Sequence, residues 1–497
     1  MDTTTDKLLA DSEYDATAPA ADAFARLIVE YFASTRRAEG PVSTPLTPAA
    51  LARRFDEPLP RAGQPLADVV ARLARDVIPD SNHLCHPRSL GHQVSAPLPA
   101  AVWTESLIGA LNQSGAVWEM SPVGTIIESR IVRWMCDLAG LGADAGGTFT
   151  SGGTEATFTA LLAARAVARP DAWEHGIGPT PPVVVCGEHA HYGVTRAVAE
   201  IGIGTNNIVV VPSREHRMDV DALAATLDRL RAESRQAMAV VATAGTTATG
   251  AFDNLEAIGE LCNRAGIWFH VDAAHGGSAL LSSAHRGRLK GLERAQSIAW
   301  DPHKLMLMPL TASMLLVSDE RALEQAFSQR APYLFHRNGE GRAWDQGLRT
   351  FQCSRRLDAI KVWVALQRYG ADGIGHLYDR LCQTARDLYE LVGARDDFEA
   401  IHEPESNIVC FRYVGEHVRK SGRPGVRESM ADTELDRLNE EIRARFNRSG
   451  EGWITVTSLG GCRVLRVTVM NPRTTRSDLE QVLEGLARCA GDVESRK

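Results

Sequence analysis

The stretch that decides the fold is "IAWDPHKLMLMPL", residues 298–310. It places Lys304 between an Asp-Pro-His corner and a run of large apolar residues that begins with Leu305 and Met306. A lysine in water gains nothing from such neighbours, and a buried lysine is costly unless it is neutralised or paired. Desolvation also favours the neutral amine, which is the nucleophilic form of the side chain. The stretch therefore predicts a lysine held in an apolar setting by a chemical partner.

Strand-like and helix-like patterns alternate around this stretch, from about residue 145 to residue 320. Apolar runs such as "PVVVC", "MAVVATAG" and "IWFHVD" are separated by amphipathic segments such as "DALAATLDRLRAES" and "NLEAIGELCNRAG". Continuous apolar strands separated by helices are typical of a mostly parallel sheet with both faces covered. Ligands of such sheets bind beyond the carboxyl ends of the strands, so we expect an α/β fold with its site at those ends.

We expect three parts along the 497 residues. Residues 1–90 predict an N-terminal helical arm, because large apolar residues between positions 24 and 32 lie at helical spacing. Residues 91–394 contain the predicted sheet domain. Residues 395–497 predict a small α+β domain, since two strand patterns there are separated by a charged helical pattern.

Composition and charge argue against several classes of function. The net charge of −8 disfavours nucleic-acid binding, which needs concentrated Lys and Arg. The polar, acidic N-terminus lacks the pattern of a signal peptide and no apolar run is long enough to span a membrane, so we expect a cytoplasmic protein with no membrane partner. The nine scattered cysteines suit reduced thiols. The cluster "HLCH" at residues 83–86 lacks a second ligand pair at zinc-like spacing, so we expect no metal.

Polar side chains gather at the ends of the predicted strands. These residues are Asp272, Thr246, Thr247, Asp301, His303 and Lys304. A further segment turns through Ser151, Gly152 and Gly153 into a helix that starts near Thr154. Glycines let backbone N–H groups approach an anion, and a helix N-terminus adds favourable partial charge, so this turn can hold a phosphate. It is no Walker loop, because the Lys-Ser/Thr end is absent.

Each of these features has an ordinary explanation when it stands alone. A Gly-Gly turn before a helix is usually only a turn, and an aspartate at a strand end is usually a helix cap or half of an ion pair. Together, a phosphate site, a buried carboxylate and a buried lysine match what pyridoxal 5'-phosphate (PLP) requires of a protein. They supply an anchor, a partner for the ring nitrogen and an amine for the aldehyde. We therefore expect PLP as the cofactor.

Five segments resemble, in order and spacing, the group II PLP-dependent amino acid decarboxylases. They are "NQSGAVWEMSPVGTIIE", "TSGGTEATFTALLAAR", "EHAHYGVTRA", "HVDAAHGGSAL" and "WDPHKLML". This family includes glutamate, cysteine sulfinate, 2,4-diaminobutyrate and aromatic amino acid decarboxylases. From about residue 80 to the C-terminus, the resemblance implies the aspartate aminotransferase-like fold, known as PLP fold type I. It also implies a homodimer.

The resemblance implies roles for the residues around the cofactor ring. Lys304 matches the Schiff-base lysine, and Asp272 matches the partner of the ring nitrogen. Ala274 resembles the residue that packs on one face of the ring, and His191 the histidine that stacks on the other. Tyr333, in a glycine-rich segment, stands at the position of the tyrosine of a mobile catalytic loop. A tyrosine there implies simple decarboxylation, with Tyr333 as the proton donor or relay to the substrate carbon.

On the phosphate side, the resemblance implies a larger group of contacts. The residues that match this group are Ser151, Gly152, Gly153, Thr154 and His303. Thr246 matches a threonine near the cofactor, and Asp301 stands where many relatives have asparagine.

The substrate is less clearly indicated. Arg466 aligns with the arginine that meets a substrate carboxylate in the family, a contact suited to a planar fork of donors. His92 lies in a polar segment that is aromatic in relatives specific for aromatic substrates. Ser114 and Ala116 stand where glutamate-type relatives have asparagine and an aromatic residue, and His275 is a further departure. We expect a polar or acidic amino acid as substrate, with Arg466, His92 and Ser114 in contact with it.

Other functions remain open at this point. An aromatic amino acid decarboxylase is the nearest alternative. An aminotransferase or a lyase of the same fold would also use Lys304 and Asp272, and a PLP-binding protein without turnover would need the same cofactor site. A nicotinamide-dependent enzyme is disfavoured, because no G-x-G-x-x-G turn follows a first strand.

Overall fold

The structure, a computed structural model, describes residues 3–328, 344–415 and 430–495. Contacts between residues divide the chain into two compact units, and each unit is described by itself. The small unit combines Met1–His92, Glu390–Ile401 and Cys410–Lys497, and the large unit combines Gln93–Tyr389 and His402–Val409. The three parts predicted from the sequence, with boundaries at residues 90 and 394, stay a prediction, because a division by contacts does not show which segments fold on their own.

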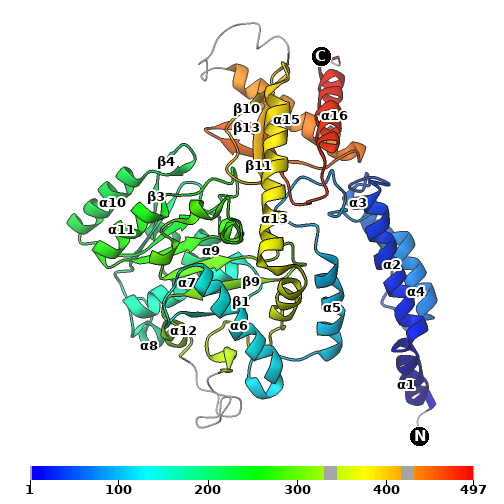
Figure 1. The fold of residues 1–497 in the computed structure, drawn as a ribbon, viewed down its shortest axis with the longest axis horizontal. Coiled ribbons are helices and arrows are strands. Elements are labelled where there is room, and N and C mark those ends of the chain that lie inside the picture. Colours follow the sequence, from blue (N-terminus) through cyan, green and yellow to red (C-terminus); the bar gives the residue numbers. More distant parts are fainter. Residues whose placement is uncertain (1–2, 329–343, 416–429, 496–497) are drawn as a thin grey trace. The chain divides into compact units, whose positions relative to one another are not determined.

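A seven-stranded sheet forms the centre of the large unit (Figure 1). Its strands, in spatial order, are β1 (Gly146–Thr150), β9 (Ser313–Val317), β8 (Ser297–Trp300), β7 (Trp268–Asp272), β6 (Ala237–Thr243), β2 (Val183–Gly187) and β3 (Ile208–Val211). From β8 to β3 every neighbouring pair is parallel, whereas β9 is antiparallel to both β8 and β1. The predicted α/β fold with a mostly parallel sheet is therefore confirmed.

The antiparallel strand β9 was not expected from the alternating pattern. Parallel neighbours need a crossover connection, usually a helix, to bring the chain back to the starting edge of the sheet. The connection from β8 to β9 contains no helix. It folds back instead, because the N–H of His303 donates to the carbonyl of Ala312 over 3.0 Å. This connection carries Lys304, so the lysine lies in a short return between two antiparallel strands.

Helices connect and flank the strands of the large unit. They are α5 (Pro99–Leu111), α6 (Pro122–Leu138), α7 (Gly153–Ala168), α8 (Ala172–His175), α9 (Gly193–Glu200), α10 (Val220–Ala232), α11 (Leu255–Ala265), α12 (Arg321–Ala326) and most of α13 (Ala359–Gly393). Short helices are η2 (Trp118–Met120), η3 (Thr205–Asn207), η4 (Gly276–Leu281), η5 (Arg286–Leu289), η6 (Leu292–Arg294) and η8 (Gln346–Leu348), and a two-stranded sheet joins β4 (Ser213–Arg214) to β5 (Arg217–Met218).

The helix ends follow local sequence signals. The Asp219 side chain caps α10 by accepting the N–H of Ala222 at 3.0 Å. The Asn254 side chain caps α11, which ends at Gly266 in the left-handed conformation with φ 64°. Within α13, Gly370 has φ 69°, so two helices meet there across a kink.

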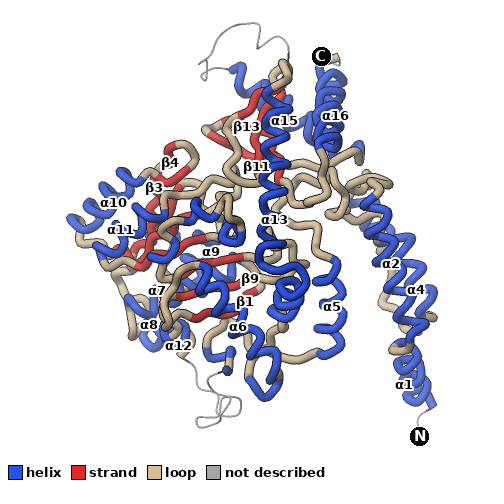
Figure 2. The backbone as a smooth tube through the Cα atoms, viewed as in Figure 1, coloured by secondary structure: helices blue, strands red, loops and turns tan. Residues whose placement is uncertain are grey.

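One buried apolar cluster of the large unit lies between the sheet and the helices α7, α9 and α12, whose backbones are drawn in Figure 2. The helix α7 buries a row of small residues, among them Ala156, Ala160 and Ala164. Small side chains let the helix approach the strands closely. As a result, the N-terminus of α7 is held firmly at the sheet edge described below.

The small unit has a four-stranded sheet in the order β10 (Phe398–Ala400), β11 (Ile408–Tyr413), β13 (Cys462–Thr468) and β12 (Thr455–Leu459). Its helices are α1 (Thr3–Asp15), α2 (Ala18–Arg36), α3 (Pro48–Arg54), α4 (Leu66–Arg72), the π-helical turn η1 (Leu73–Val77), α15 (Met430–Ser449) and α16 (Arg476–Glu494). A capping box between Thr475 and Asp478 starts α16. The predicted α+β pattern beyond residue 395 agrees with these elements.

Candidate active site

The topology of the sheet brings the predicted site residues to one edge. The strands β6, β7 and β8 are parallel neighbours, and β1 runs in the same direction as β8 because both are antiparallel to β9. The carboxyl ends of these strands therefore lie at one edge of the sheet, together with that of β2. The residues that end or follow these strands are Ser151, His191, Thr246, Asp272 and Asp301.

Lys304 lies in the turn that follows β8, and its side chain is 19% exposed. The next residues, Leu305 to Met308, are almost fully buried. The Lys304 Nζ atom is 3.1 Å from Asp301 Oδ2. Within the described residues, a buried carboxylate three residues earlier therefore compensates the charge of this lysine.

Asp301 connects the lysine to three other elements of the site. Its side chain is 1% exposed. It accepts hydrogen bonds from the Ser313 hydroxyl at 2.5 Å and from the backbone N–H of Gly153, the first residue of α7, at 3.3 Å. Burial alone would raise the pKa of Asp301, but the charges of Lys304 and His303 hold that pKa below its ordinary value. The site therefore contains an ionised carboxylate at neutral pH.

His303 completes this polar cluster. Its Nε2 atom is 3.4 Å from Asp301 Oδ2, and its Nδ1 atom accepts the N–H of Ala312 at 3.1 Å. Because Nδ1 is an acceptor, the ring proton lies on Nε2 and faces the carboxylate. Burial lowers the pKa of His303, and Asp301 offsets this only in part.

Asp272 ends β7 next to this cluster and is 8% exposed. Its Oδ1 atom accepts the N–H of Ala274 at 3.1 Å, and the carbonyl of Ala274 accepts the N–H of Asp301 at 3.2 Å. Behind Asp272 lies His270, which is fully buried and hydrogen-bonded to the Ser297 hydroxyl. Burial lowers the pKa of His270 to about 4, so this ring is neutral. His270 could not be singled out from the sequence, since it reads as one residue of an apolar strand.

The turn predicted to hold a phosphate leads into α7 as expected. Gly152 precedes the helix and has no side chain to cap its first N–H groups. Gly153 is required by packing, because a Cβ atom there would lie 2.9 Å from Ala274 Cβ and 3.1 Å from Asp301 Oδ2. The Ser151 backbone N–H and hydroxyl both donate to the Glu155 carboxylate, at 2.9 and 2.6 Å. Ser151 is thus engaged by Glu155, a residue that the sequence analysis did not single out.

His191 follows β2 and approaches the same edge. Its Nδ1 atom accepts the N–H of Gly193 at 3.1 Å, which fixes the ring. Burial lowers the pKa of His191, while the charges of Asp272 and Asp301 raise it and that of Lys304 lowers it.

Thr246 is buried, and its hydroxyl makes its hydrogen bonds to residues of the same turn. The Thr246 and Thr249 Oγ1 atoms are 2.8 Å apart, and Thr246 Oγ1 accepts the N–H of Ala251 at 3.2 Å. A contact of Thr246 with the cofactor stays a prediction.

The three predicted substrate contacts fall in different parts of the chain. Ser114 belongs to the large unit, and its Oγ atom accepts the N–H of Ala116 at 3.4 Å. His92 and Arg466 belong to the small unit, where Arg466 and Arg443 add to the effect of burial in lowering the pKa of His92. Tyr333 lies outside the described residues.

Arg466 has an unusual environment within the small unit. It lies on β13 and is 6% exposed. Its Nη2 atom donates to the Thr468 hydroxyl at 3.1 Å, whereas its Nε atom has no hydrogen-bond partner among the described residues. Burial lowers the pKa of the guanidinium. No carboxylate forms an ion pair with it in the part of the chain that the structure describes, so the side chain is suited to bind an anion from outside.

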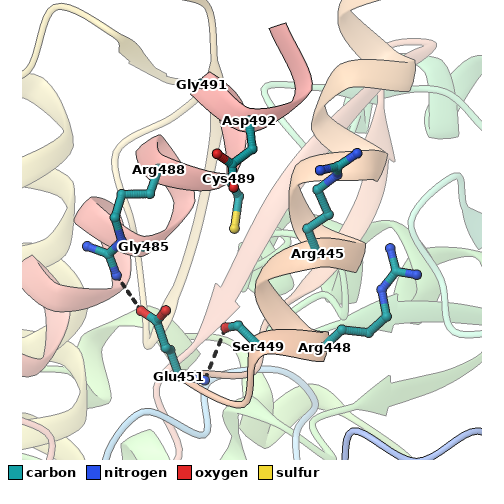
Figure 3. A pocket seen from close by; sticks show the side chains of 9 residues that line it. All are labelled: Arg445, Arg448, Ser449, Glu451, Gly485, Arg488, Cys489, Gly491 and Asp492. Atoms are coloured by element: carbon teal, nitrogen blue, oxygen red, sulfur yellow. Dashed lines mark hydrogen bonds and ion pairs between the residues drawn. The ribbon is translucent and has the colours of Figure 1, made fainter. Parts of the chain in front are cut away.

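A separate groove in the small unit contains no predicted site residue (Figure 3). It is lined by Arg445, Arg448, Ser449, Glu451, Gly485, Arg488, Cys489, Gly491 and Asp492. Two of its arginines are already paired, Arg488 with Glu451 and Arg445 with Glu441. We therefore assign the chemistry to the edge of the large sheet.

Neither a metal-binding cluster nor a membrane-spanning helix is present within the described ranges. No group of three or more His, Cys, Asp or Glu side chains is arranged to hold a metal ion there. No helix in those ranges has the length and apolar character needed to cross a bilayer.

The cluster as a whole fits PLP. Asp272 offers a buried carboxylate for a ring nitrogen, and Lys304 offers an amine that is largely shielded from solvent. The α7 N-terminus offers backbone N–H groups without a side-chain cap.

Comparisons with known proteins agree with this chemistry. The family model for the pyridoxal-dependent decarboxylase conserved domain matches residues 48–414. The chain is 34% identical to L-2,4-diaminobutyrate decarboxylase of Rhizobium meliloti (strain 1021), over 88% of this chain and 85% of that protein. It is 33% identical to human cysteine sulfinic acid decarboxylase, over 90% of each chain. The crystal structure of mouse CSAD in apo form aligns with a TM-score of 0.88 at 31% identity, covering 95% of this chain and 98% of that one.

We predict that Gly153→Ala destabilises the cofactor-free protein by about 1–3 kcal/mol, because the new Cβ must push apart Ala274 and Asp301. Gly152→Ala is the matched control, since Gly152 has an extended backbone with φ 171° and nothing lies within 4 Å of an added Cβ. Urea denaturation of the three proteins measures the difference. Equal stability of the two variants would contradict the close packing at the start of α7.

Proposed function

The chain belongs to the pyridoxal-dependent decarboxylase family, and on this premise we propose that it converts an L-amino acid with a polar or acidic side chain to the corresponding amine and carbon dioxide. The enzyme is a PLP-dependent carboxy-lyase. The observation that carries the proposal is the meeting of Lys304, Asp272 and the α7 N-terminus at one sheet edge. PLP, when bound, supplies an aldehyde that bonds to amines and a ring that draws electrons from the bond to be broken.

We assign Lys304 as the residue that bonds the cofactor. Asp301 Oδ2, 3.1 Å from Nζ, accepts a hydrogen bond from the lysine and fixes the position of its nitrogen at the sheet edge. The proton on His303 Nε2 faces the same oxygen at 3.4 Å. Asp301 therefore holds the lysine on one side and is stabilised by the imidazole on the other.

We assign Asp272 to the ring nitrogen of the cofactor. Its Oδ1 atom is held by the N–H of Ala274, which leaves Oδ2 to keep a proton on that nitrogen. Through that proton, the Asp272 carboxylate would stabilise the negative charge that develops when carbon dioxide leaves. The neutral His270 behind Asp272 fills the space without adding a competing positive charge.

The remaining roles follow from position at the same edge. We assign Ala274 and His191 to the two faces of the cofactor ring, and the phosphate to the start of α7. The residues proposed for the phosphate side are Ser151, Gly152, Gly153, Thr154 and His303, with Thr246 and Asp301 nearby. Ser151 must release Glu155 to join this group, because the serine donates both its N–H and its hydroxyl to that carboxylate.

We assign Arg466 to a carboxylate of the substrate, with His92 and Ser114 as further contacts. The support for Arg466 is its burial without a carboxylate partner among the described residues. A desolvated guanidinium binds a carboxylate through two parallel hydrogen bonds, which fixes the orientation of the substrate. Tyr333 is proposed to deliver a proton to the substrate carbon after carbon dioxide leaves.

The substrate class is supported by the names of the relatives. They include decarboxylases of 2,4-diaminobutyrate, of cysteine sulfinic acid and of acidic amino acids. These side chains are small and polar or charged. An aromatic substrate is therefore the less favoured alternative.

We predict that the PLP-loaded enzyme releases carbon dioxide and amine from at least one polar or acidic member of an amino acid panel. The panel contains L-glutamate, L-aspartate, L-cysteine sulfinate, L-2,4-diaminobutyrate, L-tryptophan and L-tyrosine. Arg466→Met should raise KM for the preferred substrate roughly 10- to 100-fold, the effect of losing hydrogen bonds to a charged group. Arg466→Lys should recover only part of this, because a lysine has no planar fork.

Arg463→Met is the control for the panel, since Arg463 lies on the same strand but is 37% exposed. It should leave KM unchanged. Turnover that requires a keto-acid acceptor, or an equal preference for aromatic substrates, would overturn the proposed function. An unchanged KM in Arg466→Met would remove Arg466 from the substrate site.

We also propose that the enzyme is a homodimer. The helix α5 exposes Trp103, Leu107 and Leu111, which are spaced four residues apart and so share one face. Exposed apolar residues continue just beyond it at Met120 and Val123. An exposed apolar helix face of this kind is typical of a protein interface, and the family likeness points to a second copy of this chain.

A location in the cytoplasm is proposed on separate grounds. All nine cysteines are free, and most of them are buried. Free thiols in this number suit a reducing compartment.

We predict that Trp103→Glu shifts the enzyme from a dimer to a monomer of 54.0 kDa, because a charge cannot be buried at an apolar interface without a partner. Trp173→Glu is the matched control, since Trp173 lies on α8 and is similarly exposed, at 48% against 41% for Trp103. Light scattering of the holoenzyme measures the mass. A dimeric Trp103→Glu variant would place the interface elsewhere.

A further inference from the structure

A buried ion pair in the large unit is not explained by the roles assigned above. Glu128 on α6 is fully buried, Arg355 is 3% exposed, and Arg355 Nη2 is 2.7 Å from Glu128 Oε1. Taking two charges out of water is costly, and a pair of this kind is by itself weak evidence for stability. The other hydrogen bonds of the pair indicate a role other than stabilising the fold.

The pair ties together two backbone segments that are distant in sequence. Arg355 Nη2 donates to the carbonyl of Phe149 at 3.1 Å, and Nη1 donates to the carbonyl of Gly115 at 3.3 Å. The carbonyl of Arg355 in turn accepts the N–H of Gly115 at 2.9 Å. Glu128 Oε1 accepts the N–H of Phe149 at 3.1 Å. One guanidinium therefore joins the loop at Gly115 to the carboxyl end of β1, which leads into the phosphate side.

The loop 112–117 fits closely against this guanidinium. A Cβ atom at Gly115 would lie 3.3 Å from Arg355 Nη1 and 3.0 Å from Leu357 Cδ2. The carbonyl of Ala116 accepts the N–H of Gly347 at 2.7 Å, and the N–H of Trp118 donates to Asp345 Oδ1 at 2.9 Å. The loop is thus attached to residues 345–347 on its other side.

The strand β1 and the loop 112–117 differ in how many other hydrogen bonds hold them in place. Each residue of β1 is paired with β9, from Gly146 opposite Val317 to Thr150 opposite Ser313. The loop has no strand partner among the described residues, and apart from bonds to the adjoining α5 and η2 it is held by hydrogen bonds to Arg355, Asp345, Gly347 and Ser121. Loss of the guanidinium fork should therefore displace the loop and leave β1 in place.

We propose that Glu128 and Arg355 are positioning residues that hold the Ser114 loop at a fixed distance from the phosphate side, and so set the affinity for the amino acid substrate. This inference rests on the proposed function, because Ser114 is assigned there as a substrate contact. The fork acts on Ser114 through the carbonyl of Gly115, the next residue. Glu128 fixes the fork and keeps its charge compensated.

The test is Arg355→Lys, which keeps a positive charge beside Glu128 but cannot reach both carbonyls. We expect KM for the preferred substrate to rise roughly tenfold while kcat and the affinity for PLP stay within about twofold. Hydrogen–deuterium exchange of the cofactor-free protein should become faster in residues 112–118 and stay unchanged in residues 146–150. Arg356→Lys is the matched control, since Arg356 is the next residue, 48% exposed, and pairs with Glu105. It should change none of these quantities.

A second variant, Glu128→Gln combined with Arg355→Gln, removes both charges without leaving one unpaired. This double variant should show the same rise in KM and the same faster hydrogen–deuterium exchange in residues 112–118. Unchanged KM and exchange in Arg355→Lys would overturn the proposal, as would a parallel loss of PLP affinity, kcat and β1 protection. Failure of both variants to fold would also overturn it, because the pair would then serve folding alone. If exchange changes as expected but the panel yields no substrate, the proposed function fails and the positioning of the loop stands.

Discussion

The ion pair between Lys304 and Asp301 is the interaction on which the site depends. A lysine beside four large buried residues would be strongly unfavourable without a compensating charge. Asp301 provides that charge and also accepts hydrogen bonds from Ser313 on β9 and from Gly153 at the start of α7. The same carboxylate that makes the buried lysine possible therefore also sets its position relative to the phosphate side.

The sheet makes this arrangement possible because parallel strands end at one edge. Asp272 and Asp301 belong to neighbouring strands, and the hydrogen bond from the N–H of Asp301 to the carbonyl of Ala274 locks the two strand ends together. The short return from β8 to β9 keeps Lys304 at that edge and does not carry it away through a helix. The amine of Lys304 and the carboxylate of Asp272 thus lie at the same edge because of the direction of the strands and the short connection from β8 to β9.

Much of this could be predicted from the sequence, because the signals are local. Continuous apolar runs between helical patterns predicted the parallel sheet, and residues at the ends of those runs, Asp272 and Lys304 among them, lie at one edge of it as expected. The Gly-Gly turn predicted the start of α7, although the reason that Gly153 must be glycine is its contact with Ala274 and Asp301. The antiparallel β9 was missed, since an apolar run gives no information on strand direction.

Contacts between distant segments could not be predicted in this way. Glu128 and Arg355 are 227 residues apart, and each reads by itself as an ordinary charged residue. The engagement of Ser151 by Glu155 competes with the predicted phosphate contact, and no propensity decides between the two. The roles of Asp272, His191 and Arg466 accordingly rest on position and burial in the structure together with the family likeness.

Borohydride reduction of the PLP-loaded enzyme, followed by peptide mass spectrometry, tests the central assignment most directly. Reduction fixes the cofactor to the amine that holds it. The label is expected on the ε-nitrogen of Lys304, within the peptide that contains "WDPHKLML". A label on another lysine, or no label in an enzyme that contains stoichiometric PLP, would contradict the site described above.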